Sequence, residues 1–346
     1  MEIFHDMKKY QTSGSGTLVE MEIPLKPNED GMVGRECPNP ECGSKYFQIG
    51  GYIPKGFLKT GQRMSDVEII CPYCGHVDNI QKFPTMEQGK WIESMIYRDM
   101  AIAVQTMLEN VAKDFKSESN TNSSLEISFE PGSLPNVRFY TEEKLKRKVT
   151  CDNCGFQYAV YGISVHCPFC GQGNLILHLN RNVDITHVLI KESENSQSKY
   201  GPDVAQRMIG NALEDVVGIF EGFLKRIYLY GIHNNFSKED ADKKEERIRV
   251  TFQRIDGAQK LFLDDLKYDI YSKISEEDRL FLEEQFLKRH VLTHNLGLVD
   301  EKYLEKAHNY LEPGSELEIL PNEVSHTLDV IATVLSETSQ HFICKK

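Results

Sequence analysis

Eight of the nine cysteines in this 346-residue sequence fall into four close pairs, and their spacing constrains the fold more than any other feature. Three pairs have two residues between the cysteines and are followed by glycine, as CPYCG, CDNCG and CPFCG. A C-x2-C turn of this kind is typical of a zinc knuckle, and glycine permits the tight turn. Because tetrahedral zinc needs two such corners, the sequence predicts two zinc ions. Their predicted ligand quartets are Cys37/Cys42/Cys71/Cys74 and Cys151/Cys154/Cys167/Cys170.

The segments inside the two quartets differ in length. The second quartet has 12 residues between its pairs, enough for a hairpin over 156–166 that folds one knuckle over the other. The first has a wider corner and 28 intervening residues, which alternate like strands and indicate an elaborated ribbon. The spacing leaves open an interleaved arrangement, in which corners from different quartets share a metal.

Four thiolates close the coordination sphere of zinc and leave no position for water or substrate, so both sites are expected to be structural. His76 and His166 flank knuckles and could replace a sulfur, but with four sulfurs present we expect them to be bystanders. Cys344 is unpaired and is expected to be inert.

The composition favours a cytoplasmic protein. The N-terminus lacks the apolar core of a secretory signal, and no stretch approaches the ~18 apolar residues of a membrane span. A cytosolic chain keeps its thiols reduced, so the cysteines are not expected to form disulfides. The formal net charge of −12 argues against a general nucleic-acid coat. Any nucleic acid would need a local site such as the basic run at 144–148, which by itself is more typical of a solvated strand face.

The order of motifs predicts an α+β multidomain protein. The expected regions are a first zinc ribbon (1–85), a connecting helix (86–118), a strand pair with the second ribbon (119–190), a polar linker (191–203) and an all-α helical bundle (204–346). The helix at 86–118 has an apolar face, for which we favour a strut packed on the ribbons over a partner-binding helix. In the bundle, apolar residues recur at steps of four and three, as in one face of a helix. They are Ile209, Leu213, Val216, Phe220, Phe223 and Ile227.

One polar cluster interrupts the bundle pattern near the end of a predicted helix at 276–295. It contains Arg289, His290 and His294, with the two histidines four residues apart on one helical face. An arginine and histidines that converge on one groove suit phosphodiester cleavage. Arginine holds the phosphate, and histidine exchanges a proton near neutral pH.

The run Arg289-His290-x3-His294 resembles the R-(polar)-x3-H motif of HEPN domains, which are helical bundles found in ribonucleases of toxin and phage-defence systems. The segments LEDVVGIFEGFLK, RHVLTHNLGLVDEKYL and ELEILPNEVSHTLDVIATVL extend the resemblance over about 200–343. The ribbons ahead of it look like the zinc-ribbon pairs sometimes fused to such domains.

The resemblance implies a metal-independent endoribonuclease that uses the 2′-hydroxyl of RNA as nucleophile. Arg289 would bind the scissile phosphate and His294 would be the acid/base. His290 would orient the substrate or His294, and Glu221 would hold the arginine. The active groove would form between the two protomers of a homodimer that pairs through the bundle. The zinc ribbons would then recognise RNA, a partner protein or a foreign trigger.

Other interpretations of these residues remain open. His290 and His294 could bind a metal, although no third ligand is evident at helical spacing. The trio could merely cap a helix end, where cations favour the negative dipole terminus. The whole chain could be a non-catalytic zinc-ribbon sensor that dimerises through the bundle. A DNA-binding regulator is disfavoured, because the sequence predicts no basic surface.

Overall fold

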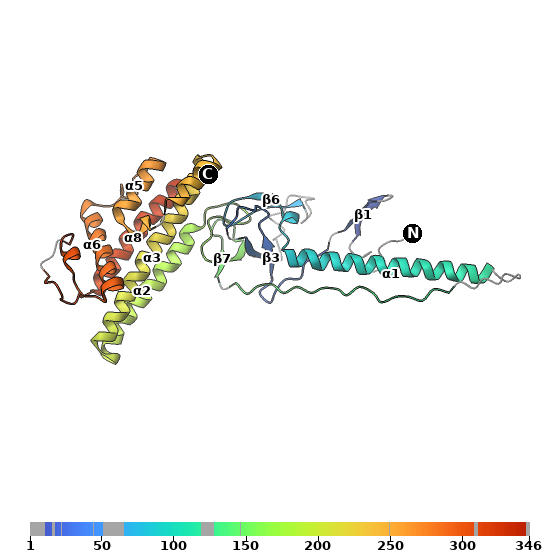
Figure 1. The fold of residues 1–346 in the computed structure, drawn as a ribbon, viewed down its shortest axis with the longest axis horizontal. Coiled ribbons are helices and arrows are strands. Elements are labelled where there is room, and N and C mark those ends of the chain that lie inside the picture. The colour runs from blue at the N-terminus through green and yellow to red at the C-terminus, as the bar shows by residue number, and fades with distance from the viewer. Residues whose placement is uncertain are drawn as a thin grey trace. The chain divides into compact units, whose positions relative to one another are not determined.

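The computed structural model describes residues 11–15, 18–21, 23–43, 45–50, 66–118, 128–145, 147–248, 250–307 and 311–343. The chain divides into two compact units, Met1–Gly171 and Gln172–Lys346. The first contains small antiparallel sheets and one long helix, and the second is helical (Figure 1). The protein is therefore mixed α+β, as predicted, and mostly helical. In the described part of the chain, no helix has the length and hydropathy needed to cross a lipid bilayer.

Both cysteine-rich segments contribute to one four-stranded antiparallel sheet, with strand order β3-β4-β8-β7. Its strands are β3 (Met32–Glu36), β4 (Tyr46–Gly50), β7 (Arg147–Thr150) and β8 (Gln157–Val160). The β4–β8 pairing, with Phe47 opposite Val160, joins the two ribbons. The ribbons predicted as separate regions, 1–85 and 119–190, are thus parts of one unit. Two further hairpins are β1 (Gln11–Ser15) with β2 (Leu18–Met21), and β5 (Glu68–Ile70) with β6 (Val77–Asn79).

Cysteine corners form the turns between consecutive strands of this unit. The 151–154 corner connects β7 to β8, and the 71–74 corner connects β5 to β6. The hairpin predicted inside the second quartet, over 156–166, is therefore replaced by a hairpin that spans the knuckle. The glycines after the three knuckles have φ of +75°, +70° and +73°, so the predicted need for glycine is confirmed. They are Gly75, Gly155 and Gly171.

The predicted connecting helix is α1 (Met86–Glu118), which follows a short 3-10 turn, η4 (Ile80–Lys82). An extended segment, 128–145, runs beside α1 (Figure 1). The strand pair predicted before the second ribbon does not form in its described part, because the backbone there bonds to helix side chains. Ser94 accepts a hydrogen bond from the amide of Arg138 at 2.9 Å, and Arg98 donates to the carbonyl of Pro135 at 3.0 Å. The rest of the predicted strand pair, 119–127, lies outside the described residues.

The second unit begins earlier than predicted, with α2 (Leu175–Tyr200). The segment predicted as a linker, 191–203, is helical except at Gly201, whose φ is +93°. Its polar composition suits a helix because serine hydroxyls donate hydrogen bonds to carbonyls of the preceding turn. Ser193 donates to Ile190 at 2.6 Å, and Ser196 donates to Ser193 at 2.7 Å. Pro202 then occupies the first turn of the next helix, where its missing amide hydrogen is not needed.

The core of the second unit lies among α2, α3 (Pro202–Asn235) and α8 (Pro321–Phe342). The predicted apolar face of α3 is confirmed, since all six of its residues are at most 2% exposed. The remaining helical elements are α4 (Lys238–Glu246), η5 (Thr251–Gln253), α5 (Ile255–Leu266), α6 (Glu276–Asn295) and α7 (Glu301–Leu304). Of these, α6 packs on both α3 and α8, with Phe286 edge-to-face against Phe220. The bundle thereby supports α6, while His290, Thr293 and His294 in its last turns are exposed.

Candidate functional site

The first cysteine quartet joins the corner between β3 and β4 to the turn between β5 and β6. The Sγ atoms of Cys37 and Cys74 are 3.7 Å apart, as are those of Cys42 and Cys71. All four sulfurs lie within 4.8 Å of one another. Asn39 donates from its side chain to the Sγ of Cys74 at 3.8 Å. The two corners thus enclose a small space bounded by sulfur.

The second quartet repeats this arrangement with the turn between β7 and β8. The Sγ atoms of Cys151 and Cys170, and those of Cys154 and Cys167, are again 3.7 Å apart. Asn153 donates to the Sγ of Cys170 at 3.5 Å, as Asn39 does in the first quartet. Such donors stabilise thiolates, since they place a partially positive hydrogen next to the negative sulfur. The sequence also places both asparagines two residues after the first cysteine, a signal that spacing alone could have found.

The sulfur distances fit a tetrahedral metal. Four thiolates bound to zinc at about 2.3 Å have neighbouring sulfurs about 3.8 Å apart, close to the 3.7 Å observed. A disulfide would require about 2.05 Å. Each cluster contains the four cysteines of one quartet, so the interleaved arrangement is not formed and the flanking histidines belong to neither cluster. The two quartets could therefore hold two zinc ions. Cys344 lies outside the described residues.

Ionisation also favours a cation at each cluster. Hydrogen bonding among the sulfurs lowers the pKa of Cys74 and Cys42 and raises that of Cys71 and Cys37. In the second quartet, burial raises the pKa of Cys154 to about 11. Thiols packed this closely do not all ionise by themselves, because each thiolate disfavours the next. A bound dication removes that penalty and makes the four thiolates compatible.

The arginine-histidine cluster lies in the last two turns of α6. The imidazoles of His290 and His294 are both exposed, with ring centroids 4.6 Å apart. Arg289 is half-buried, and its Nε is buried without a hydrogen-bond partner among the described residues. The helix ends at Leu296, which adopts a left-handed conformation with φ of +55°. The structure therefore brings the three predicted residues to one helix end, at the surface.

The electrostatic surroundings favour a neutral His290. Partial burial is the main cause that lowers its pKa below the usual value, and His294, Lys302 and Arg289 lower it further. Asp300 acts in the opposite direction. A neutral imidazole at neutral pH can both accept and donate a hydrogen bond, whereas the protonated ring can only donate. His290 is thus suited to hold a hydroxyl group or a neighbouring imidazole.

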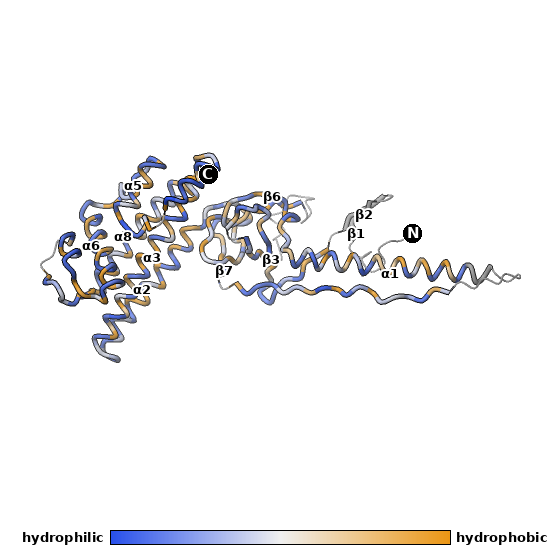
Figure 2. The backbone as a smooth tube through the Cα atoms, viewed as in Figure 1, coloured by the Kyte–Doolittle hydropathy of each residue, from blue (hydrophilic) through white to orange (hydrophobic). Residues whose placement is uncertain are grey.

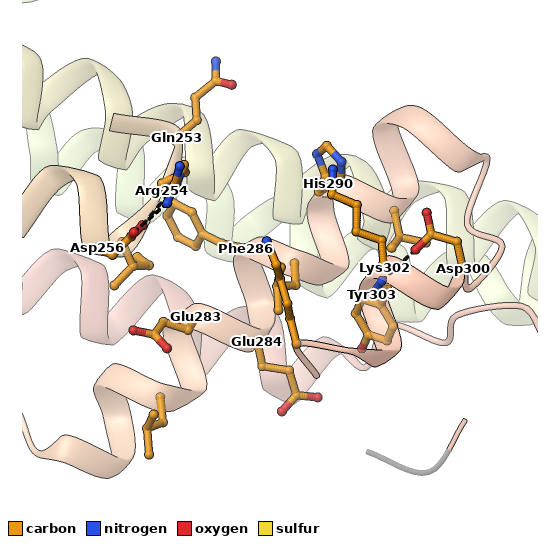
Figure 3. Close-up of a pocket in the computed structure, with 15 residues that line it drawn as sticks. Gln253, Arg254, Asp256, Glu283, Glu284, Phe286, His290, Asp300, Lys302 and Tyr303 are labelled. Carbon is orange, nitrogen blue, oxygen red and sulfur yellow. Dashed lines mark hydrogen bonds and ion pairs between the residues drawn. The ribbon is translucent and has the colours of Figure 1, made fainter. Parts of the chain in front are cut away.

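A cavity of about 600 Å³ lies beside His290, between α6 and the start of α5 and α7. Figure 3 shows His290 and Lys302 near one end, with Asp300, and shows Asp256 and Glu283 on the other side of Phe286. Lys306 also lines this cavity, whereas Arg289 and His294 do not. Sequence reasoning did not identify the two lysines or the cavity, because these appear only when α5, α6 and α7 come together.

The acidic residue implied for Arg289 is placed elsewhere. Glu221 accepts hydrogen bonds from the side chain of Gln253 at 3.2 and 3.4 Å. Another carboxylate of α3, Glu214, accepts from Thr293 at 3.0 Å, and Thr293 lies one residue before His294. Among the described residues, the α3 carboxylate that bonds to the end of α6 is therefore Glu214. Glu221 remains only a proposed partner of the arginine.

Basic residues of the run at 144–148 form contacts within the first unit. Lys148 forms an ion pair with Asp30 at 2.6 Å, and Arg147 donates to the carbonyl of Gly162 at 2.7 Å. Lys144 lies 3.9 Å from Glu29, and Lys146 is outside the described residues. Among the described residues of the run, Arg147 and Lys148 thus bond within the first unit, whereas the side chain of Lys144 is 91% exposed.

No protein-family model, curated protein or solved structure matches the chain significantly.

Proposed function

We propose that the chain is a metal-independent endoribonuclease whose reacting groups lie at the end of α6. The observation that carries the proposal is the pair of exposed imidazoles of His290 and His294, 4.6 Å apart, on the same helix end as the half-buried Arg289. Histidine and arginine supply the proton transfer and the phosphate binding that phosphodiester cleavage requires. The resemblance to HEPN domains supports the same assignment.

In the proposed reaction, the 2′-oxygen of RNA forms a bond to phosphorus and the bond to the 5′-oxygen breaks. The products are a 2′,3′-cyclic phosphate and a free 5′-hydroxyl. His294 acts as acid/base and exchanges the proton that leaves the 2′-hydroxyl or reaches the 5′-oxygen. Arg289 holds the phosphate through its guanidinium group. His290 orients the substrate or His294, and a homodimer through the bundle completes the groove.

Two structural zinc ions support this chemistry indirectly. Each quartet supplies four sulfurs, which close the coordination sphere and leave no position for substrate. The zinc ions therefore have a structural role, and the ribbons that they hold form a recognition surface for RNA, a partner protein or a trigger. The expected zinc content is two ions per chain, measured by elemental analysis of the purified protein. Regulated cleavage of a narrow set of RNAs fits the net charge of −12 better than general RNA turnover.

The test is cleavage of total and structured RNA by the purified, zinc-loaded full chain in buffer with no added metal ion. Arg289→Ala and His294→Ala should each reduce the rate at least ~100-fold, since they remove the phosphate ligand and the proton carrier. His233→Ala is the matched control, because His233 is an exposed imidazole that pairs with Glu245 on another part of the bundle. Equal cleavage by all three variants would refute the site assignment.

A non-catalytic zinc-ribbon sensor is the alternative. It is favoured by the observation that the carboxylate of Glu221 accepts from Gln253, so that this residue, implied as the partner of the arginine, is bonded elsewhere. If no RNA is cleaved while the chain retains its zinc, this alternative replaces the nuclease.

A further inference from the structure

The middle and distal turns of α1 carry a line of apolar side chains exposed to solvent. These are Tyr97, Met100, Val104, Met107 and Val111, which are between 37% and 57% exposed. Figure 2 shows hydrophobic positions recurring along this helix. Large apolar side chains are normally scattered singly over a surface. A line of five on one helix therefore indicates a contact surface, which we call the α1 stripe.

The neighbouring part of the chain covers a different side of α1. Segment 128–145 contacts Ser94 and Arg98, and the carbonyl of Gly132 accepts a hydrogen bond from Gln105 at 2.8 Å. Trp91 packs edge-to-face on Tyr140 of the same segment. None of these helix residues belongs to the α1 stripe. The strut predicted from the sequence therefore applies to the first turns of α1, and the distal turns keep an apolar face in solvent.

The spacing of the α1 stripe is that of a coiled coil. Its residues are separated by three, four, three and four positions, which is the a/d pattern of a seven-residue repeat. A stripe of this width fits the seam between two helices better than the broad face that packs into a globular core. This pattern favours another helix as the occupant.

We propose that the α1 stripe pairs antiparallel with the same stripe of a second copy of this chain. With Val104 of one copy against Met107 of the other, Met100 lies against Val111, and four consecutive layers are apolar. Tyr97 then lies opposite Asp114 at both ends, where a phenol can donate to a carboxylate. A parallel pair would instead place two copies of Asp114 together in the seam, which like-charge repulsion disfavours.

The residues flanking the stripe also suit a second copy. The positions beside the seam are uncharged and include small residues, so two identical helices can approach without repulsion. They are Ala101, Ala103, Leu108 and Asn110. Over 97–118 the helix is nearly neutral in a chain whose net charge is −12, so local charge does not oppose self-association. Its basic residues are Arg98, Lys113 and Lys116, and its acidic residues are Asp99, Glu109, Asp114 and Glu118.

The test places the photo-reactive residue p-benzoylphenylalanine at position 97 of the full chain. A mixture of ¹⁵N-labelled and unlabelled chains is irradiated, and mixed-isotope peptides identify links between copies. The pairing predicts links from position 97 to residues 111–118 of the other copy. Links back to the region of residue 97 would show a parallel pair, and the absence of links between copies would overturn the proposal altogether.

A matched pair of substitutions excludes accidental collisions. Val104→Glu should reduce the yield of links at least ~10-fold, because it places one charge in each of the two central apolar layers. Thr106→Glu should leave the yield unchanged, because Thr106 lies about 200° around the helix from Val104. Equal yields in both variants would contradict the pairing. Unchanged zinc content confirms that each variant is folded, and RNA cleavage is not part of the readout, so this result is independent of the proposed nuclease.

Discussion

The two units of this chain are held together in different ways. In the first unit, strands are three to five residues long, and five of the fifteen residues in its main buried cluster are cysteines of the two quartets. In the second unit, α3 alone is 34 residues long and buries an uninterrupted apolar face against its neighbours. A small sheet with a cysteine-rich core depends on a cation, whereas a helical bundle depends on burial of apolar area. The comparison implies that the units respond independently to different perturbations.

The largest expected difference follows from metal removal. A strong chelator should unfold the first unit and leave the second folded, because structural zinc contributes about 10–16 kcal/mol in small zinc domains at pH 7. Hydrogen exchange measured by mass spectrometry on the full chain should show loss of protection at β7 and β8 and retention at α3. Cys167→Ser should lower the zinc content by one ion, and Cys344→Ser should not. Unchanged protection of β8 after zinc loss would contradict a metal-held core.

The next effect tests the apolar core of the second unit. Leu213→Ala should destabilise this unit by about 2–5 kcal/mol, since Leu213 is fully buried in the face of α3. Leu296→Ala is the matched control, because Leu296 is 86% exposed, and its effect should stay within about 0.5 kcal/mol. Chemical denaturation of the zinc-loaded chain, followed by helical circular dichroism, measures both. Equal losses would show that the α3 face is not the core.

A smaller effect on stability tests the knuckle turns. Substitution of glycine by alanine should change stability in opposite directions at two positions. Gly155→Ala should cost about 1–2 kcal/mol, because φ is +70° there and left-handed backbone is unfavourable for alanine. Gly89→Ala, within α1, should instead gain about 0.5–1 kcal/mol, since alanine favours a helix and nothing lies within 4 Å of the new methyl group. Thermal unfolding of the two variants provides the measurement. Changes of the same sign would contradict the assigned turn.

The smallest effect concerns proton binding at the end of α6. His294→Ala and Lys302→Ala should each raise the pKa of His290, because both groups lower it. The sign for stability follows from the depressed value. As pH falls, the unfolded chain binds this proton before the folded chain does. The stability that His290 contributes is therefore present above its unfolded pKa and is lost as pH falls through its folded pKa. NMR titration of the imidazole measures the shift, and an unchanged pKa in both variants would contradict the placement of these groups.

Local patterns predicted the parts of each unit that depend on local spacing. The knuckle glycines could be predicted because only a backbone with positive φ closes those turns. The apolar face of α3 could be predicted because its period is that of a helix. The grouping of the cysteines into two quartets, made from the spacing of the pairs alone, was also correct.

Features that depend on distant contacts escaped prediction. The pairing of β4 with β8 merges the ribbons, and no residue in either segment indicates its distant partner. The segment at 191–203 was taken for a linker from its polar composition, although its serines are satisfied within a helix. At the candidate site, Lys302 was missed because α7 meets α6 only after the chain folds back. The α1 stripe was not separated from the buried face, because the position of segment 128–145 determines which side remains exposed.

The proposed chemistry at the end of α6 is tested most directly by the ends of the RNA fragments. The zinc-loaded chain should convert an RNA oligonucleotide into one fragment with a 2′,3′-cyclic phosphate and one with a 5′-hydroxyl, identified by mass spectrometry. A 2′-deoxy substitution at the cleaved nucleotide should abolish cleavage there, and Arg289→Ala and His294→Ala should abolish both products. Fragments with 5′-phosphates, or cleavage that persists at the 2′-deoxy position, would contradict the account.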